Sequence, residues 1–213
     1  MVRGRQNWLY GPEETANAYP LCLPELSWVL DESLPGRSVH FLPRIAIGIP
    51  SFREADSIAH VAAIADDGLT RLFPAEDCVI VNADGHSPDG TAAAFQPTST
   101  QCPKVSLDIT SAQPGKGANV VAFWEYCAEN GIEAAAMLDA DVTSITPGWI
   151  ASLLQPAVAG QAAMAFPLYR RHRFEGATTN LFAYPVISAL CGSSIRQPIG
   201  GDFGLGRDLL ISP

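Results

Sequence analysis

The sequence predicts an α/β domain in which a mostly parallel β-sheet carries helices on both faces. Short apolar runs alternate along the chain with segments of helical periodicity, which is the pattern of strand–helix–strand units. The runs are continuously apolar, as expected for parallel strands that are buried on both faces. Two runs end in or lead directly into an acidic residue, at the sheet edge where open α/β folds bind their ligands.

The elements are expected in alternating order after an N-terminal arm. Residues 1–42 are rich in Pro, Glu and aromatic residues, and we expect an arm with one short helix at 24–31, followed by a single domain over 43–213. Proline is tolerated in the first turn of a helix, so Pro147 marks a helix start. We expect strands at 44–50, 78–84, 104–109, 134–138 and 161–167, and helices from 51 or 54 to 67, at 91–95, at 118–130, from 147 onward and at 177–190.

Composition excludes several classes of function. The chain is 47% hydrophobic and 16% charged, and 213 residues fit one folded domain. A net charge of −9 argues against binding nucleic acid, which requires a basic surface. The five cysteines form no C-x-x-C pair, so we expect reduced, mostly buried thiols in a cytoplasmic protein. No apolar run has the length of a transmembrane helix.

Several nucleotide-binding and hydrolase motifs are absent from the sequence. There is no G-x-G-x-x-G, and Gly117 stands where a P-loop requires Ser or Thr. The segment after the second strand differs from the nucleophile elbow of a serine hydrolase, because Asp89 replaces the second glycine. Any phosphate ligand must therefore be held by other means.

The most informative motif is Asp139-Ala140-Asp141, which directly follows the apolar run at 134–138. Alternate residues of an extended segment face the same side, so the two carboxylates can converge on one hard cation such as Mg²⁺ or Mn²⁺. A nucleotide diphosphate needs such a cation to mask its charge. The motif alone is weak, because a solvated turn at a strand end has the same composition.

Polar or glycine-rich groups also follow other predicted elements. Asp84 ends the second strand and suits a base or ribose, with capping of the next turn as an equal alternative. Lys116, between two glycines at a helix start, can meet a phosphate or base carbonyl, with a solvated loop lysine as the alternative. Gly200 and Gly201 precede Asp202 and allow the backbone to approach a ligand closely.

Taken in order, the motifs I-P-S-F-R-E, V-N-A-D-G, P-G-K-G, D-A-D-V-T-S and Q-P-I-G-G-D resemble those of GT-A-fold glycosyltransferases. The similarity is greatest to the retaining glucosyl-3-phosphoglycerate synthases and mannosylglycerate synthases, and it covers residues 44–210. It implies a Rossmann-like GT-A fold and metal-dependent transfer of a hexose from a UDP- or GDP-sugar to a small hydroxy acid such as glycerate, with retention. It also implies Mg²⁺ or Mn²⁺ as cofactor, and a homo-oligomer is left open.

The resemblance implies a role for each matching residue. Asp139 and Asp141 bind the metal, and Thr179 binds the acceptor carboxylate. Asp202 is the nearest candidate for an auxiliary catalytic acid. The residues that bind the nucleotide sugar are Pro50, Ser51, Phe52, Glu54, Asp84, Lys116, Asp139, Ala140, Gly200 and Gly201.

The chain departs from the family in two respects. Ala177 stands where the phosphoglycerate enzymes have an Arg, so a phosphorylated acceptor requires a substitute such as Arg171. Arg171 belongs to the basic segment 168–174, which we interpret as anion recognition, with a solvated hairpin as the alternative. Family members also continue beyond this length with a histidine metal ligand, so a truncated or non-catalytic domain that binds nucleotide sugar is the alternative function. A sugar-phosphate nucleotidyltransferase is less favoured, because 50–54 lacks the glycines of its N-terminal loop.

Overall fold

The structure, a computed structural model, describes residues 44–109, 115–169, 176–192 and 195–210. The chain divides into two units, Met1–His40 and Phe41–Pro213, and every described residue belongs to the second. The predicted arm with its helix at 24–31 lies outside the described residues.

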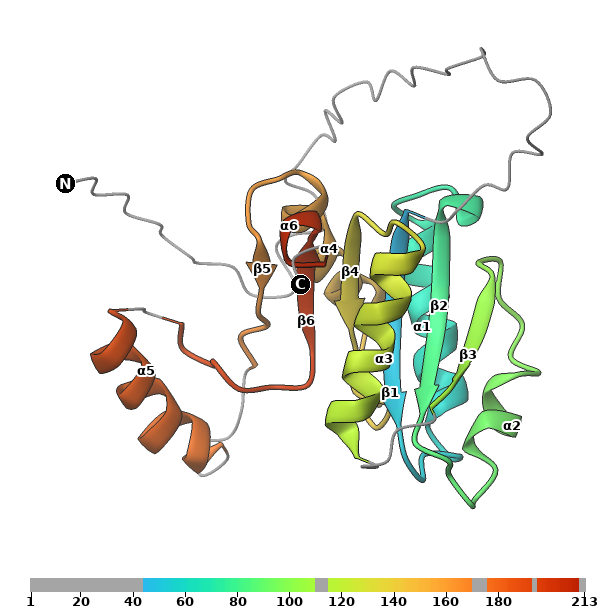
Figure 1. Cartoon of the computed structure of the whole chain (residues 1–213), viewed down its shortest axis with the longest axis horizontal. Coiled ribbons are helices and arrows are strands. Elements are labelled where there is room, and N and C mark those ends of the chain that lie inside the picture. Colours follow the sequence, from blue (N-terminus) through green and yellow to red (C-terminus); the bar gives the residue numbers. More distant parts are fainter. Residues whose placement is uncertain (1–43, 110–114, 170–175, 193–194, 211–213) are drawn as a thin grey trace, which may run out of the picture. The chain divides into compact units, whose positions relative to one another are not determined.

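The described domain is built on a six-stranded sheet with the order β3-β2-β1-β4-β6-β5 (Figure 1). β1 is parallel to β2 and β4, and β2 is parallel to β3. β6 runs antiparallel to both of its neighbours, β4 and β5. The sheet is therefore mostly parallel, as the sequence predicts. The strands are β1 (Ile45–Ser51), β2 (Cys78–Asp84), β3 (Lys104–Asp108), β4 (Ala134–Met137), β5 (Met164–Ala165) and β6 (Phe203–Gly206).

β1 lies at the centre of the sheet, and all of its residues are buried. A parallel strand between two neighbours and two helical layers is covered on every side, which explains its continuous apolar sequence. Pro50 is compatible with this position because pairing with β4 ends at Gly48. The missing N–H of Pro50 therefore falls beyond the last β4 partner, where no sheet hydrogen bond is lost.

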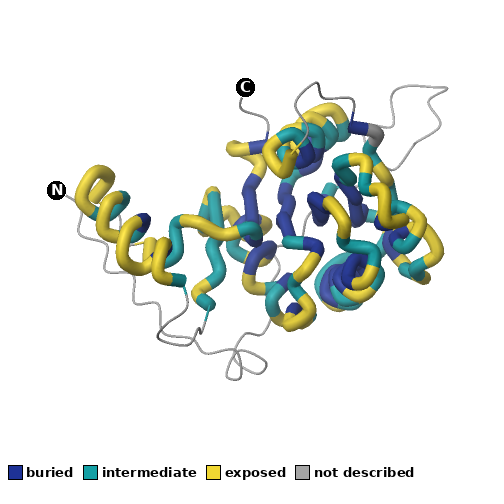
Figure 2. Tube along the Cα trace, turned by 90° about the horizontal axis from the view of Figure 1, so that it is seen from below, coloured by how far each residue is buried: buried dark blue, intermediate teal, exposed yellow. Residues whose placement is uncertain are grey.

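Helices cover both faces of the sheet, as predicted (Figure 1). One core cluster joins the apolar faces of α1 and α4 to the sheet, and a second cluster joins α3 to the opposite face. Figure 2 shows the strands as a buried interior and the outer sides of the helices as exposed. The helices are α1 (Ile58–Thr70), α2 (Thr91–Phe95), α3 (Lys116–Glu129), α4 (Pro147–Val158), α5 (Tyr184–Cys191) and α6 (Arg207–Leu210), with a π-helical segment η3 (Thr178–Ala183) and a 3₁₀ turn η2 (Ala75–Asp77).

The close approach of α3 to the sheet depends on a glycine in β1. A Cβ atom at Gly48 would lie 2.6 Å from the ring of Phe123, which is fully buried on α3. A side chain there would push α3 away from β1. The packing therefore fixes the start of α3, including Lys116, beside the carboxyl ends of the central strands.

Some elements differ from the prediction. α1 begins at Ile58 instead of 51 or 54, because the main-chain N–H groups of Ser57 and Ile58 both bond to the carbonyl of Glu54 in a turn that precedes the helix. β5 is shorter than the predicted strand at 161–167. β6 was not predicted, because its sequence Phe-Gly-Leu-Gly lacks the β-branched residues that mark strands. Gly204 is needed there, since a Cβ would lie 2.0 Å from the carbonyl oxygen of Leu153 on α4.

The described cysteines are reduced and mostly buried, as predicted. Cys78, Cys102 and Cys127 are buried and Cys191 is exposed, and all four are free thiols. Burial raises the pKa of Cys127 to about 12. None of the helices in the described ranges has the length and hydropathy needed to cross a membrane.

Candidate functional site

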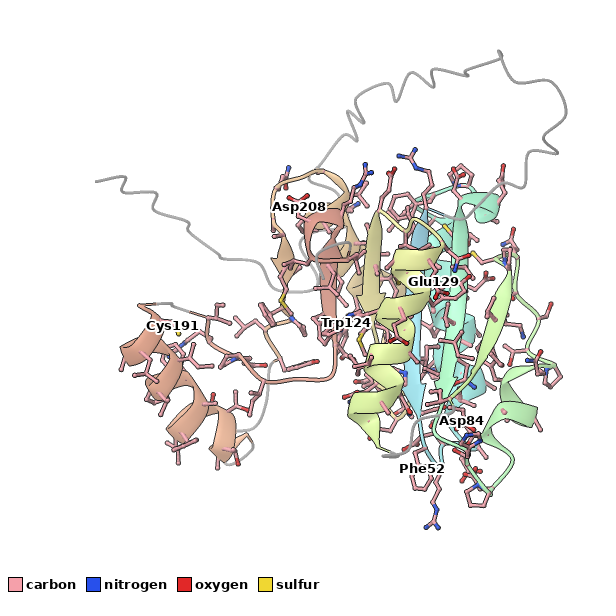
Figure 3. The ribbon with its side chains drawn as sticks, viewed as in Figure 1. Phe52, Asp84, Trp124, Glu129, Cys191 and Asp208 are labelled. Atoms are coloured by element: carbon pink, nitrogen blue, oxygen red, sulfur yellow. The ribbon has the colours of Figure 1, made fainter. Side chains whose placement is uncertain are left out.

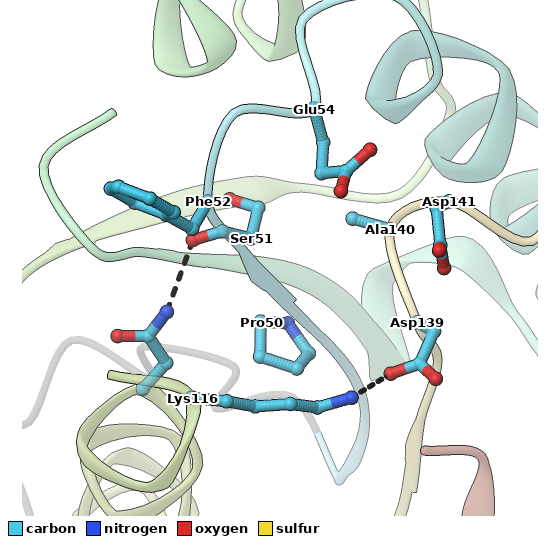
Figure 4. Close-up of a pocket in the computed structure, with 9 residues that line it drawn as sticks. Pro50, Ser51, Phe52, Glu54, Lys116, Asp139, Ala140 and Asp141 are labelled. Atoms are coloured by element: carbon cyan, nitrogen blue, oxygen red, sulfur yellow. Dashed lines mark hydrogen bonds and ion pairs between the residues drawn. The ribbon is translucent and has the colours of Figure 1, made fainter. Parts of the chain in front are cut away.

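A pocket of about 210 Å³ lies at the carboxyl ends of β1 and β4 (Figure 4). It joins three segments that the sequence analysis singled out separately: the end of β1, the start of α3 and the turn after β4. This is the edge of a parallel sheet where ligands are expected. The lining residues are Pro50, Ser51, Phe52, Glu54, Lys116, Asn119, Asp139, Ala140 and Asp141.

The loop before β6 holds Asp139 in place. The main-chain N–H of Asp139 donates to Oδ1 of Asp202 at 2.7 Å. The carboxylate lies directly over the backbone of Gly201, where a Cβ would be 1.8 Å from Oδ2. Asp202 therefore holds the main chain of Asp139, and Gly201 leaves the space that the Asp139 carboxylate occupies. The close approach at Gly201 is made by a protein carboxylate, and the approach of a ligand to this glycine stays a prediction.

Lys116 reaches across the pocket to Asp139 (Figure 4). It is the first residue of α3, and its ammonium forms an ion pair with the Asp139 carboxylate. The side chains are 54% and 27% exposed, so the pair lies at the open mouth of the pocket. The interaction shows that the Asp139 carboxylate presents its oxygens to a cation inside the pocket.

Asp139 and Asp141 fit the expected divalent cation in part. The carboxylate of Asp139 already holds a cationic group, and Asp141 is exposed on the same turn. Within the ranges that the structure describes, no group of three or more His, Cys, Asp and Glu side chains is arranged to hold a metal ion. Magnesium is commonly held by one or two carboxylates together with substrate phosphates, so this pair suits a cation that arrives with a diphosphate.

The segment after β1 is anchored from several sides. Ser51 is buried, its hydroxyl donates to Oδ1 of Asn82 at 2.7 Å, and its carbonyl accepts a bond of 3.0 Å from Nδ2 of Asn119. The N–H of Glu54 donates to the hydroxyl of Thr91 at 2.9 Å. Between these anchors Phe52 is 53% exposed, so an apolar ring is presented to the pocket on a fixed backbone.

Asp84 supports this segment and is not among the residues that line the described pocket. Its carboxylate accepts hydrogen bonds from the hydroxyl of Ser51 at 3.2 Å and from the main-chain N–H of Ser87 at 3.0 Å. These bonds correspond to the alternative interpretation, in which Asp84 caps the turn after its strand. Figure 3 shows Phe52 and Asp84 at the same end of the sheet, and Asp208 at the opposite end.

Asp202 is buried beneath the pocket, with an exposed fraction of 1%. Its Oδ2 accepts a hydrogen bond of 2.7 Å from the hydroxyl of Tyr169, while Oδ1 accepts the bond from the Asp139 main chain. Burial raises the pKa of Asp202 above its ordinary value, although these two hydrogen bonds oppose the shift. Both oxygens are engaged, so the structure gives Asp202 a positioning role toward Asp139.

An apolar groove of about 580 Å³ adjoins the pocket and shares Lys116 with it. The predicted pair Gly200 and Gly201 lies in this groove and not in the pocket itself. Trp124 on α3 is 41% exposed there (Figure 3). The remaining lining residues are Gly117, Val120, Val121, Met137 and Phe203.

Two predicted acceptor residues are not brought to the described pocket. Thr179 lies on η3 with 7% exposure and is not among the residues lining the pocket or the groove. Arg171 and most of the basic segment lie outside the described residues. The acceptor role of both residues stays a prediction.

Asn119 and Tyr169 are site residues that the sequence analysis missed. Asn119 is 2% exposed on α3, one turn before Phe123 on the buried face of the helix, and an isolated amide at this helical spacing was the available signal. Tyr169 stands at the start of the basic segment, where the neighbouring arginines obscured it. Its main chain is held by Gln197, whose amide accepts from the Tyr169 N–H at 3.1 Å and donates to the Tyr169 carbonyl at 3.0 Å.

The strand order, the helical layers and a carboxylate-bearing turn after β4 define a GT-A fold. No protein-family model and no curated protein matches the chain. Solved structures of glucosyl-3-phosphoglycerate synthase from Mycobacterium tuberculosis share the fold. The complex with Mn²⁺, UDP and glucosyl-3-phosphoglycerate has a TM-score of 0.61 and 24% identity, over 78% of this chain and 58% of that chain.

Two further complexes of the same mycobacterial enzyme are similar over a longer stretch. The complex with Mn²⁺, UDP-glucose and phosphoglyceric acid has a TM-score of 0.61 and 23% identity, over 83% of this chain and 63% of that chain. The complex with Mn²⁺, UDP-glucose and glycerol 3-phosphate has a TM-score of 0.60, again over 83% of this chain and 63% of that chain. The chain thus spans less than two thirds of the length of these proteins.

Proposed function

We propose that this chain is a metal-dependent glycosyltransferase that moves a hexose from a UDP- or GDP-sugar to a small hydroxy acid such as glycerate. The observation that carries the proposal is that the end of β1, Lys116 and the Asp139–Asp141 turn line one and the same pocket in a GT-A fold. The similar mycobacterial structures contain Mn²⁺ with UDP or UDP-glucose, which supports a nucleotide-sugar donor. A cytoplasmic location and a homo-oligomer stay predictions.

In the proposed reaction the bond between the anomeric carbon and the diphosphate breaks, and a bond to the acceptor oxygen forms. The acceptor hydroxyl loses its proton to the departing diphosphate, so the products are a glycoside and a nucleoside diphosphate. Attack from the face that the diphosphate leaves gives retention. Asp139 and Asp141 would hold a divalent cation, which would supply Lewis-acid stabilisation of the leaving diphosphate. Pro50–Glu54 provide a fixed wall for the nucleotide, and Asp202 keeps the Asp139 main chain in position.

A second candidate function is binding of nucleotide sugar without turnover. It is favoured by the pair of carboxylates at the pocket, since no third acidic, histidine or cysteine ligand joins them in the described part of the chain. The two candidates differ in one measurement: release of nucleoside diphosphate upon mixing the protein with Mn²⁺, a donor and glycerate.

The donor site is tested by Asp141→Ala, assayed by thermal shift with a panel of UDP- and GDP-sugars and Mn²⁺. Asp141 is exposed, so the variant is expected to fold normally and to lose the Mn²⁺-dependent stabilisation by the donor. Asp208→Ala is a matched control, because it removes an exposed carboxylate at the opposite end of the sheet (Figure 3). Unchanged donor binding in Asp141→Ala would contradict the site assignment.

A further inference from the structure

Lys116 differs in its surroundings from the other lysine of the chain, Lys104. The ammonium of Lys104 donates to the carbonyls of Phe95 and Gln96 at 2.8 Å and of Thr98 at 2.5 Å, and it thereby closes the end of α2. Lys116 has a carboxylate as its partner in the pocket. One lysine therefore stabilises the fold, while the other neutralises the residue expected to hold the metal.

The two partners of the Lys116–Asp139 pair differ in mobility. The main chain of Asp139 is held by the bond from its N–H to Asp202, and its carboxylate, on a short side chain, occupies the space beside Gly201. Lys116 carries its charge on a flexible four-carbon side chain that is 54% exposed. The ammonium can therefore leave the pair by rotation of a long, exposed side chain, whereas the carboxylate is carried on a short side chain from a held main chain.

A divalent cation and the ammonium compete for the same carboxylate. Like charges a few ångströms apart repel, and the pocket mouth screens this repulsion only in part. A cation that takes Asp139 therefore displaces Lys116, which then needs another anion within reach. Lys116 also lines the pocket beside Pro50 and Ser51, where a bound diphosphate would supply such an anion.

We propose that Lys116 is an internal competitor of the divalent cation, which occupies Asp139 until a diphosphate draws the ammonium away. The inference rests on the proposed donor site and adds a rule for how that site fills. Metal and nucleotide therefore bind cooperatively. The diphosphate draws the Lys116 ammonium away from Asp139 and so frees this carboxylate for the metal, and the metal at Asp139 frees the ammonium for the diphosphate. By thermodynamic linkage, the factor by which UDP strengthens Mn²⁺ binding equals the factor by which Mn²⁺ strengthens UDP binding.

The test measures Mn²⁺ binding by the full chain, by electron paramagnetic resonance of free Mn²⁺, with and without UDP. Lys116→Met keeps an apolar side chain of similar length and removes the charge. We expect its Mn²⁺ affinity without nucleotide to rise about tenfold, within the usual range of coupling between sites. We expect the strengthening by UDP to fall by a similar factor of about ten.

Two variants serve as controls. Arg71→Met removes the same charge from an exposed i,i+4 pair with Asp67 on α1, and its Mn²⁺ affinity should equal that of the wild type. Lys116→Arg retains a cation and should keep the weak affinity. The unfolding midpoints of all variants are measured, so that a folding defect is recognised.

The outcomes separate this inference from the proposed function. An Mn²⁺ affinity of Lys116→Met that is unchanged or weaker without nucleotide overturns the competition. An equal rise in Arg71→Met also overturns it, because the effect would then be one of net charge. Tighter Mn²⁺ binding by Lys116→Met, together with no UDP binding by the wild type, supports competition at Asp139 and contradicts the nucleotide-sugar proposal.

Discussion

Gly201→Ala is the most direct perturbation of the site. A Cβ at this position would lie 1.8 Å and 1.9 Å from the two carboxylate oxygens of Asp139 and 2.0 Å from its Cγ. These separations are about half of an ordinary contact of about 3.5–4.0 Å. The Asp139 carboxylate or the loop backbone must therefore move. Gly200→Ala is the matched control, since its nearest neighbour is the Tyr169 ring at 3.8 Å.

The expected loss follows from the two ways of relieving the clash. Rotation of the Asp139 side chain out of its rotamer costs about 0.5–1.5 kcal/mol, and displacement of the packed loop costs about 1–3 kcal/mol. The exposed ion pair with Lys116 adds less than about 1 kcal/mol. We therefore expect Gly201→Ala to lose about 1–3 kcal/mol of unfolding free energy, or about 2–4 °C in Tm per kcal/mol. Gly200→Ala should change stability by less than about 0.5 kcal/mol.

Urea unfolding and Mn²⁺-dependent binding of UDP-glucose form the assay. Gly201→Ala should weaken metal-dependent binding in addition to lowering stability, because the displaced group is the proposed metal ligand. A double-mutant cycle locates the clash: in an Asp139→Ala background the carboxylate is absent, so Gly201→Ala should then have little effect. Equal effects of Gly200→Ala and Gly201→Ala, or the same loss in both backgrounds, would refute the reasoning.

Two further predictions concern buried ionisable groups. Burial raises the pKa of Asp202, so the native protein takes up this proton at a higher pH than the unfolded chain. Relative to Asp202→Asn, the wild type should therefore gain unfolding free energy as the pH falls from about 7 towards the ordinary carboxyl pKa of about 4. Urea titrations at several pH values measure this difference, and a loss of unfolding free energy over the same range would contradict a raised pKa of Asp202. In a Cys22→Ser background, one thiol (Cys191) should react with Ellman's reagent in the native state, and the buried thiols should react only after unfolding. Rapid labelling of Cys127 in the native protein, identified by mass spectrometry, would contradict the burial of this thiol in the core.

The parallel half of the fold could be predicted because its signals are local. β1, β2 and β4 are short apolar runs, and a strand covered on both faces must be apolar on both faces. Pro147 marked the start of α4 for a similarly local reason. The first N–H groups of a helix make no hydrogen bond within the helix, so the missing N–H of a proline costs nothing there. The Asp139–Asp141 turn followed from its place after one of these runs.

Other parts depend on contacts between residues that are distant in sequence. β6 contains two glycines, and Gly204 is needed for the approach of Leu153 on α4, which no local pattern shows. The sequence gives Gly201 and Asp202 the appearance of ligand-contacting residues, whereas the structure places both against Asp139. Asp84 ends its strand as predicted, and only the structure shows that Ser51 and Ser87 bond to its carboxylate.

The topology explains why the loop before β6 meets the turn after β4. The two strands are antiparallel and pair Met137 with Phe203, so the beginning of β6 lies at the carboxyl end of β4. Continuing this register by two residues on each strand places Asp139 opposite Gly201. A parallel sixth strand would put its preceding loop at the other end of the sheet, far from the pocket. The reversal of β6 therefore allows one loop to provide both the space for the Asp139 carboxylate and the acceptor for its main-chain N–H. The two motifs, Asp-Ala-Asp and Gly-Gly-Asp, consequently form one structural unit that holds a carboxylate toward the pocket, where Lys116 pairs with it.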